Sequence, residues 1–169
     1  MSKKVIGMIV AAILVVAVIV AVVVVNGNKN EDVTENNKKT TENVEMNLEE
    51  LNEEWASMAP FNEMATMDID STMLSDVFQV EEDLLDGYVG KFPMMMVHAS
   101  MYLVVEAKDG NVETVREQVE AYATAYEAQW EQYLPEQYDL VKDRKCGVSG
   151  NFVYLFIGES AEEMEALIK

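Results

Sequence analysis

The feature that most constrains this chain is an uninterrupted apolar run from Val5 to Val25, which contains no charged residue, Asn, Gln or Pro. A helix rises about 1.5 Å per residue, so the run would cover about 30 Å, the thickness of the hydrocarbon core of a bilayer. The buried helix of a soluble domain is rarely apolar on every face over such a length. Residues 5–25 therefore predict a single transmembrane helix.

Lys3 and Lys4 precede the run. By the positive-inside bias they predict that residues 1–4 are a cytoplasmic tip and that the chain after the anchor is extracytoplasmic. A cleaved signal peptide has a shorter apolar core of about 7–15 residues and a small-x-small cleavage site, so cleavage is the less favoured alternative. A lipoprotein would need a cysteine directly after the run, but the only cysteine is Cys146. We expect an uncleaved signal anchor in the cell membrane.

Residues 26–45 have Val33 and Val44 as their only aliphatic side chains. They cannot bury enough apolar surface to offset the entropy lost on ordering, which predicts a flexible polar linker. Residues 46–169 would then form the extracytoplasmic domain. The chain has 31 acidic residues against 12 Lys and Arg, a net charge of −19. This charge excludes a nucleic-acid partner held through its phosphates, and it disfavours direct adsorption to anionic lipid or teichoic acid.

The first half of the domain mixes helical and strand patterns. Asn47, followed three residues later by an acid, is a helix start signal, and apolar side chains then recur every three or four residues until Pro60. The segment 70–87 suggests two short helical pieces. Residues 95–108 alternate apolar and polar side chains, which predicts a strand with one buried face, followed by a turn at Gly110.

The second half gives a clearer pattern, because apolar and aromatic side chains keep helical spacing for six turns from Val112 to Tyr133. Pro135 ends that helix and suits the first turn of a second one, predicted from Glu136 to about Asp143. Two strands at residues 146–149 and 151–157 joined at Ser149-Gly150, and a closing helix with a Ser160–Glu163 capping box, are predicted to follow. The apolar strand 151–157 is expected in the interior of the sheet. We predict an α+β fold in which a small, mainly antiparallel sheet packs on a long amphipathic helix.

Three segments of this pattern resemble a known family. They are Val104-Val105-Glu106-Ala107, then the helix through Val115 and Val119 to Gln129, Tyr133, Pro135 and Gln137, and the hairpin Gly150-Asn151-Phe152-Val153-Tyr154. From about Leu48 to Lys169 the chain resembles domain of unknown function 4358, whose members look like exported proteins of Gram-positive bacteria, many of them lipoproteins. The resemblance implies a cell-envelope location and carries no established activity or functional residue. This chain lacks the lipoprotein cysteine, which leaves the helix as its tether.

Few residues suggest catalysis or metal binding. His98 and Ser100 could form a dyad, but side chains two apart on a strand have their roots about 6.5–7 Å apart, and no orienting acid accompanies them. One His and one Cys make a zinc site improbable. The segment from Asp68 to Thr72 begins like a calcium loop but lacks the required Gly and bidentate Glu. The acidic cluster Glu81-Glu82-Asp83 with Asp86 is expected to be a solvated face rather than a weak calcium site.

Methionine and cysteine offer two further candidates. Met94, Met95, Met96 and Met101 invite a copper(I) interpretation, because thioethers are soft ligands. Strand alternation would send Met95 and Met101 inward and scatter the set over two faces, so packing is the favoured role. Cys146 follows a basic cluster whose cations could lower the pKa of its thiol, although an unpaired, partly buried thiol is the simpler interpretation. That cluster, Lys142, Arg144 and Lys145, could dock an anionic polymer or be balanced by neighbouring acids such as Asp139.

We therefore expect a membrane-tethered extracytoplasmic interaction module of the cell envelope rather than an enzyme, with no cofactor and no assigned catalytic or metal residue. Its partner would be an envelope protein or a wall polymer. The aromatic residues of the long helix and its successor are candidates for the recognition surface: Tyr122, Tyr126, Trp130, Tyr133 and Tyr138. The alternatives are an envelope enzyme acting on cell-wall material, with a cleft around His98, and a weak metal-binding domain.

Overall fold

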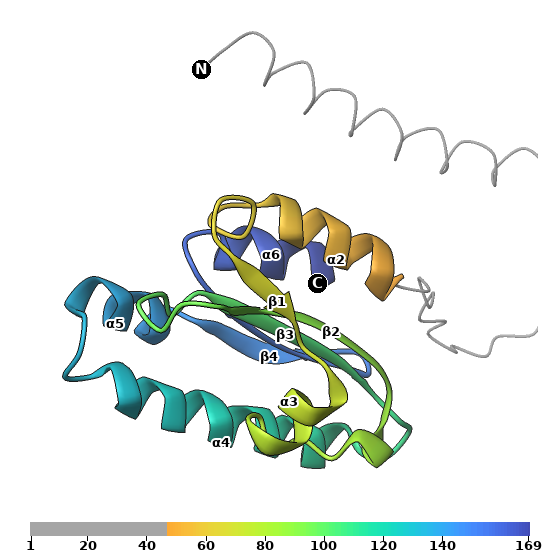
Figure 1. Ribbon diagram of the computed structural model, residues 1–169. Coiled ribbons are helices and arrows are strands. Elements are labelled where there is room, and N and C mark those ends of the chain that lie inside the picture. The colour runs from red at the N-terminus through yellow and green to blue at the C-terminus, as the bar shows by residue number, and fades with distance from the viewer. Residues whose placement is uncertain (1–46) are drawn as a thin grey trace, which may run out of the picture. The chain divides into compact units, whose positions relative to one another are not determined.

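The computed structural model describes residues 47–169, so the predicted anchor at residues 5–25 and the linker at 26–45 lie outside the described residues. Within 47–169 the fold is α+β, with one five-stranded sheet and helices on both of its faces (Figure 1). No helix in this part of the chain has both the length and the apolar character needed to cross a membrane. The elements are α2 (Leu48–Ser57), β1 (Thr66–Asp68), α3 (Ser71–Asp76), the 3₁₀ helix η1 (Glu82–Leu84), β2 (Leu85–Pro93), β3 (Met101–Ala107), α4 (Val112–Trp130), α5 (Pro135–Lys142), β4 (Lys145–Ser149), β5 (Phe152–Ile157) and α6 (Ala161–Ile168).

The strands are ordered β1-β2-β3-β5-β4, and every neighbouring pair is antiparallel. The middle strand β3 sets the register, since Val104 pairs with Val89 of β2 on one side and with Tyr154 of β5 on the other. Every residue of β5 from Phe152 to Ile157 is buried. This burial confirms the expectation that the apolar strand lies in the interior of the sheet.

Two apolar cores form, one on each face of the sheet. Met101 and Leu103 of β3 face α4, where Val119 is fully buried. The alternate residue Tyr102 faces the opposite layer, where it packs with Trp55 of α2 and where α6 also lies. The predicted alternation is confirmed, because successive residues of β3 point to opposite faces of the sheet in the expected order. The prediction that one of these faces is exposed to solvent is wrong. Tyr102 is fully buried because α2 and α6 cover the second face (Figure 1).

Most of the predicted helix boundaries are confirmed. The Asn47 side chain caps α2 by accepting hydrogen bonds from the backbone N–H groups of Glu49 and Glu50, at 3.0 and 3.4 Å. The β4–β5 turn contains Gly150 at φ +62°, a conformation that favours glycine. The predicted capping box at the start of α6 does not form, because the Ser160 side chain makes no capping hydrogen bond.

Two segments differ from the sequence prediction. The first of the two helical pieces predicted within residues 70–87 is confirmed as α3, whereas the second is reduced to the short 3₁₀ helix η1. From Leu85 the chain is strand β2, which pairs with β3 as far as Lys91. Its Gly90 lies so close to β3 that an added Cβ would come within 2.5 Å of the Tyr102 carbonyl oxygen. The strand expected from Met95 begins only at Met101, because the chain before it makes a turn in which the His98 N–H donates to the Met95 carbonyl at 3.1 Å.

Candidate functional site

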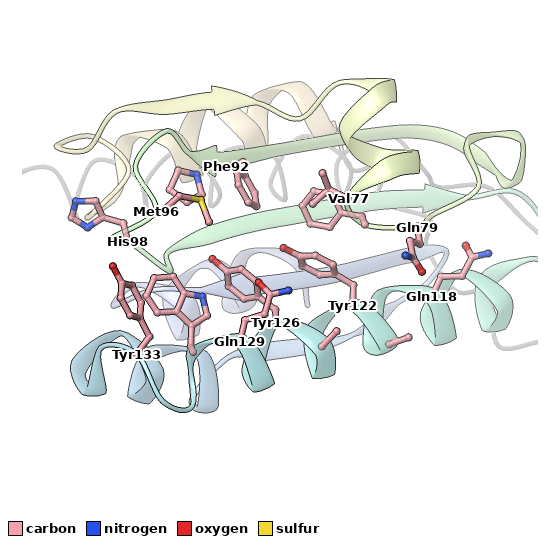
Figure 2. A pocket seen from close by; sticks show the side chains of 15 residues that line it. Val77, Gln79, Phe92, Met96, His98, Gln118, Tyr122, Tyr126, Gln129 and Tyr133 are labelled. Carbon is pink, nitrogen blue, oxygen red and sulfur yellow. The ribbon is translucent and has the colours of Figure 1, made fainter.

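An open groove of about 760 Å³ runs along α4, on the face of the sheet that α4 covers (Figure 2). Helix α4 forms one wall. The other wall comes from the chain after α3, the end of β2 and the loop before β3. The lining residues are Val77, Phe78, Gln79, Phe92, Pro93, Met96, His98, Gln118, Ala121, Tyr122, Ala125, Tyr126, Gln129, Trp130 and Tyr133.

The helical period of α4 explains how one helix serves both the core and the groove. Val115, Val119 and Ala123 are buried against the sheet. The residues beside this apolar stripe turn toward the groove, so that Tyr126 and Trp130 are 6% and 5% exposed while their rings still line it. The sequence assigns the aromatic residues to core packing first. Tyr122, Tyr126 and Trp130 serve both roles, whereas Tyr133 is exposed in the groove and Tyr138 packs against the core without lining it.

A continuous row of six aromatic rings forms the apolar part of the groove. The closest pair is Phe78 and Tyr122, whose ring centroids are 4.4 Å apart. Neighbouring rings are 4.4 to 6.1 Å apart along the whole row, close to or within the range of about 4.5–7 Å that favourable aromatic pairs adopt. In order, the row is Phe92, Phe78, Tyr122, Tyr126, Trp130 and Tyr133.

The buried phenols of this row are occupied by the protein itself. The Tyr126 hydroxyl donates to the Ala99 carbonyl at 3.3 Å, and the Tyr122 hydroxyl donates to the Met101 sulfur at 3.5 Å. Burial raises the pKa of Tyr126 to about 12 and the pKa of Tyr122 well above its usual range, so both phenols are neutral at physiological pH. These groups form a wall rather than an acid–base pair.

Several polar side chains in the lining, among them Gln79, His98 and Gln129, are available to a ligand. Gln79, His98 and Gln129 make no side-chain hydrogen bond to any other residue in the part of the chain that the structure describes. Gln79 lies opposite Gln118 at one end of the groove, and His98 lies near Tyr133 at the other end (Figure 2). An apolar row with a few polar groups at its margins is typical of ligand-binding sites.

Each end of the groove has a carboxylate beside it. At one end Gln118 donates to the Glu81 carboxylate at 3.0 Å and accepts from the Glu81 N–H at 3.3 Å. At the other end a smaller hollow of about 400 Å³ shares His98 with the groove and includes Glu136 in its lining. The groove itself is lined by no Asp, Glu, Lys or Arg within residues 47–169.

An exposed apolar lip borders the groove. Residues 94–97 are all exposed, with Met96 at 74%, and Met96 also lines the groove. The prediction that Met95 points inward is wrong, because it lies in the turn before β3, whereas Met101 is fully buried as expected. The methionines considered as copper ligands are therefore divided between the surface and the core.

The structure does not bring the proposed dyad together. His98 lines the groove, whereas Ser100 is buried and its Oγ lies close to Gly158, where an added Cβ would approach it to 3.4 Å. The strand geometry that would have put both side chains on one face is absent, because β3 starts at Met101.

Two of the candidate metal ligands, Asp68 and Asp70, have structural roles, whereas Glu82, Asp83 and Asp86 are exposed. Asp68 pairs with Lys91 at 2.5 Å, and Asp70 caps α3 by accepting from the Met73 N–H at 2.8 Å. Across the described residues 47–169, no three His, Cys, Asp or Glu side chains come together in a way that could hold a metal ion.

Cys146 and two residues of the basic cluster, Lys142 and Arg144, are also accounted for by packing and pairing. Cys146 is a free, partly buried cysteine, as the simpler interpretation expected. Burial raises the pKa of its thiol to about 11, which is opposite in direction to the lowering that the neighbouring cations suggested. Lys142 pairs with Asp139 at 3.5 Å, as local balancing predicted, and Arg144 pairs with Glu127 of α4 at 2.6 Å. No reactive thiolate is expected here.

Sequence reasoning missed the polar residues of the groove. Gln118 and Gln129 have helical spacing relative to the aromatic residues of α4. This spacing places uncharged polar side chains next to the aromatic face, which is the one local indication that part of that face is not buried core. Gln79 and Met96 carried no such signal, because they reach the groove from segments distant in sequence.

Comparison with curated proteins and with solved structures finds no match to this chain. A family model does match. Residues 59–158, more than half of the chain and including every residue that lines the groove, match the model described as Domain of unknown function (DUF4358). The chain belongs to the DUF4358 family.

Proposed function

We propose that this protein is a membrane-tethered binding module of the bacterial cell envelope and that the groove along α4 is its recognition site. The observation that carries the proposal is the open groove of about 760 Å³ with its row of six rings. Its volume falls within the range of about 300–1,000 Å³ typical of ligand sites. The apolar run at residues 5–25 and the lysines before it support an extracytoplasmic position for the domain.

The proposed mechanism is recognition without chemistry. The lining of the groove within residues 47–169 contains no carboxylate, amine or thiol, and its two most buried phenols are neutral and internally hydrogen bonded. A ligand would gain affinity by covering the aromatic row, and Gln79 and Gln129 would fix its orientation through hydrogen bonds.

An envelope enzyme acting on wall material is the second candidate. The observation in its favour is the position of His98, which lines both the groove and the smaller hollow next to Glu136. His98→Gln distinguishes the two functions, because a binding module keeps its ligand while an enzyme that uses the imidazole loses turnover. Release of soluble fragments from purified cell wall measures that turnover.

The proposal is tested by placing a photoreactive amino acid with a small aliphatic diazirine side chain, which is smaller than the ring of Phe, at Ala125, which lines the groove, in the full-length protein in its native membrane. Ala166 is the matched control, because it is also an exposed alanine on a helix but lies on α6, on the opposite layer of the sheet. We expect an adduct of defined mass from position 125 and none from position 166. The same adducts from both positions, or none from position 125, would contradict the proposal.

A further inference from the structure

We infer that the occupant of the groove is a peptide segment with apolar side chains at its centre and Lys or Arg at both ends. This inference deepens the proposed function and rests on it. It starts from the distribution of charge around the groove. The lining is uncharged, while Glu81 lies beside one end and Glu136 beside the other.

The dimensions of the groove suit a short segment. From Gln118 to Trp130 the groove follows about 18 Å of helix, at about 1.5 Å per residue. An extended peptide rises about 3.3 Å per residue, so five or six residues cover this length. Basic residues just outside that span would meet the carboxylates of Glu81 and Glu136.

The remaining charges of the domain favour a cationic partner over an anionic one. The cationic side chains of Lys91, Arg116, Lys142, Arg144 and Lys169 are each paired with a carboxylate of the domain. The chain as a whole carries a net charge of −19. An approaching polyanion would be repelled, whereas a basic segment would be attracted and oriented.

The lip next to the groove favours a peptide over a sugar. Residues 94–97 expose three methionines and a valine, and Met96 continues from this lip into the groove. Exposed apolar patches mark interaction surfaces, and methionine-rich ones adapt to apolar side chains of different shapes. A glycan would leave these side chains without complementary contacts.

The test uses the full chain in nanodiscs of zwitterionic lipid, with empty nanodiscs as the blank. The probes are three synthetic peptides, KKLFVLFKK, EELFVLFEE and KKSGSGSKK. Binding is read from tryptophan emission and, independently, from the anisotropy of labelled peptide. Trp130 reports on the groove, while Trp55 is fully buried in the other core and gives a constant background.

We expect KKLFVLFKK to bind with a Kd in about the micromolar range and the other two peptides to bind at least about tenfold more weakly. Ala125→Phe and Ala121→Phe, which fill the groove, should each abolish binding. Ala128→Phe, on the same helix but outside the lining, should leave it unchanged. Glu81→Gln with Glu136→Gln should weaken binding and reduce its salt dependence, whereas Glu162→Gln with Glu163→Gln on α6 should not.

Equal binding of the acidic and basic peptides would overturn the inference, as would binding that survives both groove-filling substitutions. Failure of all three peptides would also overturn it. The proposed function is tested by a different result, the photoadduct at position 125 in the native membrane, so it can be contradicted independently of the peptide inference. If that adduct is a wall glycan or a lipid, the binding module stands and the peptide inference falls.

Discussion

The rings of Tyr122 and Tyr126 stack along α4 with their centroids 5.5 Å apart and their planes 21° from parallel. The hydroxyl groups of this pair point into the core. The Tyr122 hydroxyl donates to the Met101 sulfur, and the Tyr126 hydroxyl donates to the Ala99 carbonyl. The exposed surface of the pair belongs to the groove. The packing that stabilises the fold therefore also holds this wall of the groove rigid.

The buried tyrosines predict a loss of stability at alkaline pH. Burial raises the pKa of Tyr126 from 10.0 to about 12, and it also raises the pKa of Tyr102 and Tyr122. Because the folded-state pKa lies above the unfolded one, this contribution is fully present below pH 10 and is lost as pH rises toward 12. One pKa unit corresponds to about 1.4 kcal/mol, so Tyr126 alone accounts for at most about 3 kcal/mol.

The free energy of unfolding in urea, measured from neutral pH to about pH 11, checks this prediction. Tyr126→Phe should reduce the slope above pH 10. Tyr133→Phe is the control, because Tyr133 is 56% exposed and its removal should leave the slope unchanged. Stability that is flat up to pH 11 would show that the phenols are not buried as described.

Cys146 is predicted to react slowly. Its pKa is raised from 9.0 to about 11, mainly by burial, with a further contribution from Glu120. At pH 8 the thiolate fraction should be about a hundredfold smaller than in the unfolded chain, and alkylation correspondingly slower. The rate with iodoacetamide, in buffer and in urea, measures the difference. Equal rates in both conditions would contradict the described environment of the thiol.

Gly147 of β4 is predicted to resist substitution because of one close contact. A Cβ at this position would lie 2.6 Å from Tyr154 Oη and 2.9 Å from Tyr154 Cζ. We expect Gly147→Ala to destabilise the fold by about 1–3 kcal/mol, the usual cost of overpacking. Tyr154→Phe removes the nearest atom, so the cost of Gly147→Ala should be smaller in that background. The free energy of unfolding is measured for the unaltered chain, the two single variants and the double variant. If Gly147→Ala is equally destabilising with Tyr154 and with Phe at position 154, the contact with the Tyr154 hydroxyl is not the cause.

The N-terminal run predicts an uncleaved membrane anchor. The full chain should remain in the membrane after carbonate extraction, and deletion of residues 1–25 should release it. Protease added to intact cells should digest the part after the anchor. Tags at both ends should stay on one polypeptide, whereas separation of the tags would show that the signal is cleaved.

The sequence predicted the helices better than the sheet, for identifiable reasons. Helix α4 repeats its apolar spacing over many turns, so its period is unambiguous. Strand β2 was missed because Gly87, Gly90 and Pro93 look like breakers of regular structure. Gly90 is instead required because Ile69 and the Tyr102 backbone pack against it too closely for a side chain. Only the three-dimensional structure shows this contact.

The groove could be predicted only in part. The aromatic positions on α4 were identified from sequence, but residues with the same spacing also serve as core. Whether a helix face is covered depends on segments that pack beside it. Here Gln79 and Met96 come from segments before and after β2, and no local pattern indicates that they stop short of covering α4.

The most direct test of the central claim is a crosslinking pull-down of the full-length protein from its native membrane. It is run in parallel with Ala125→Phe, Ala128→Phe and a chain of residues 1–45. We predict one defined partner that is recovered with the unaltered chain and with Ala128→Phe but is lost with Ala125→Phe and with residues 1–45. Recovery of the same partner in equal amount with Ala125→Phe would contradict the claim that the groove along α4 is the recognition site.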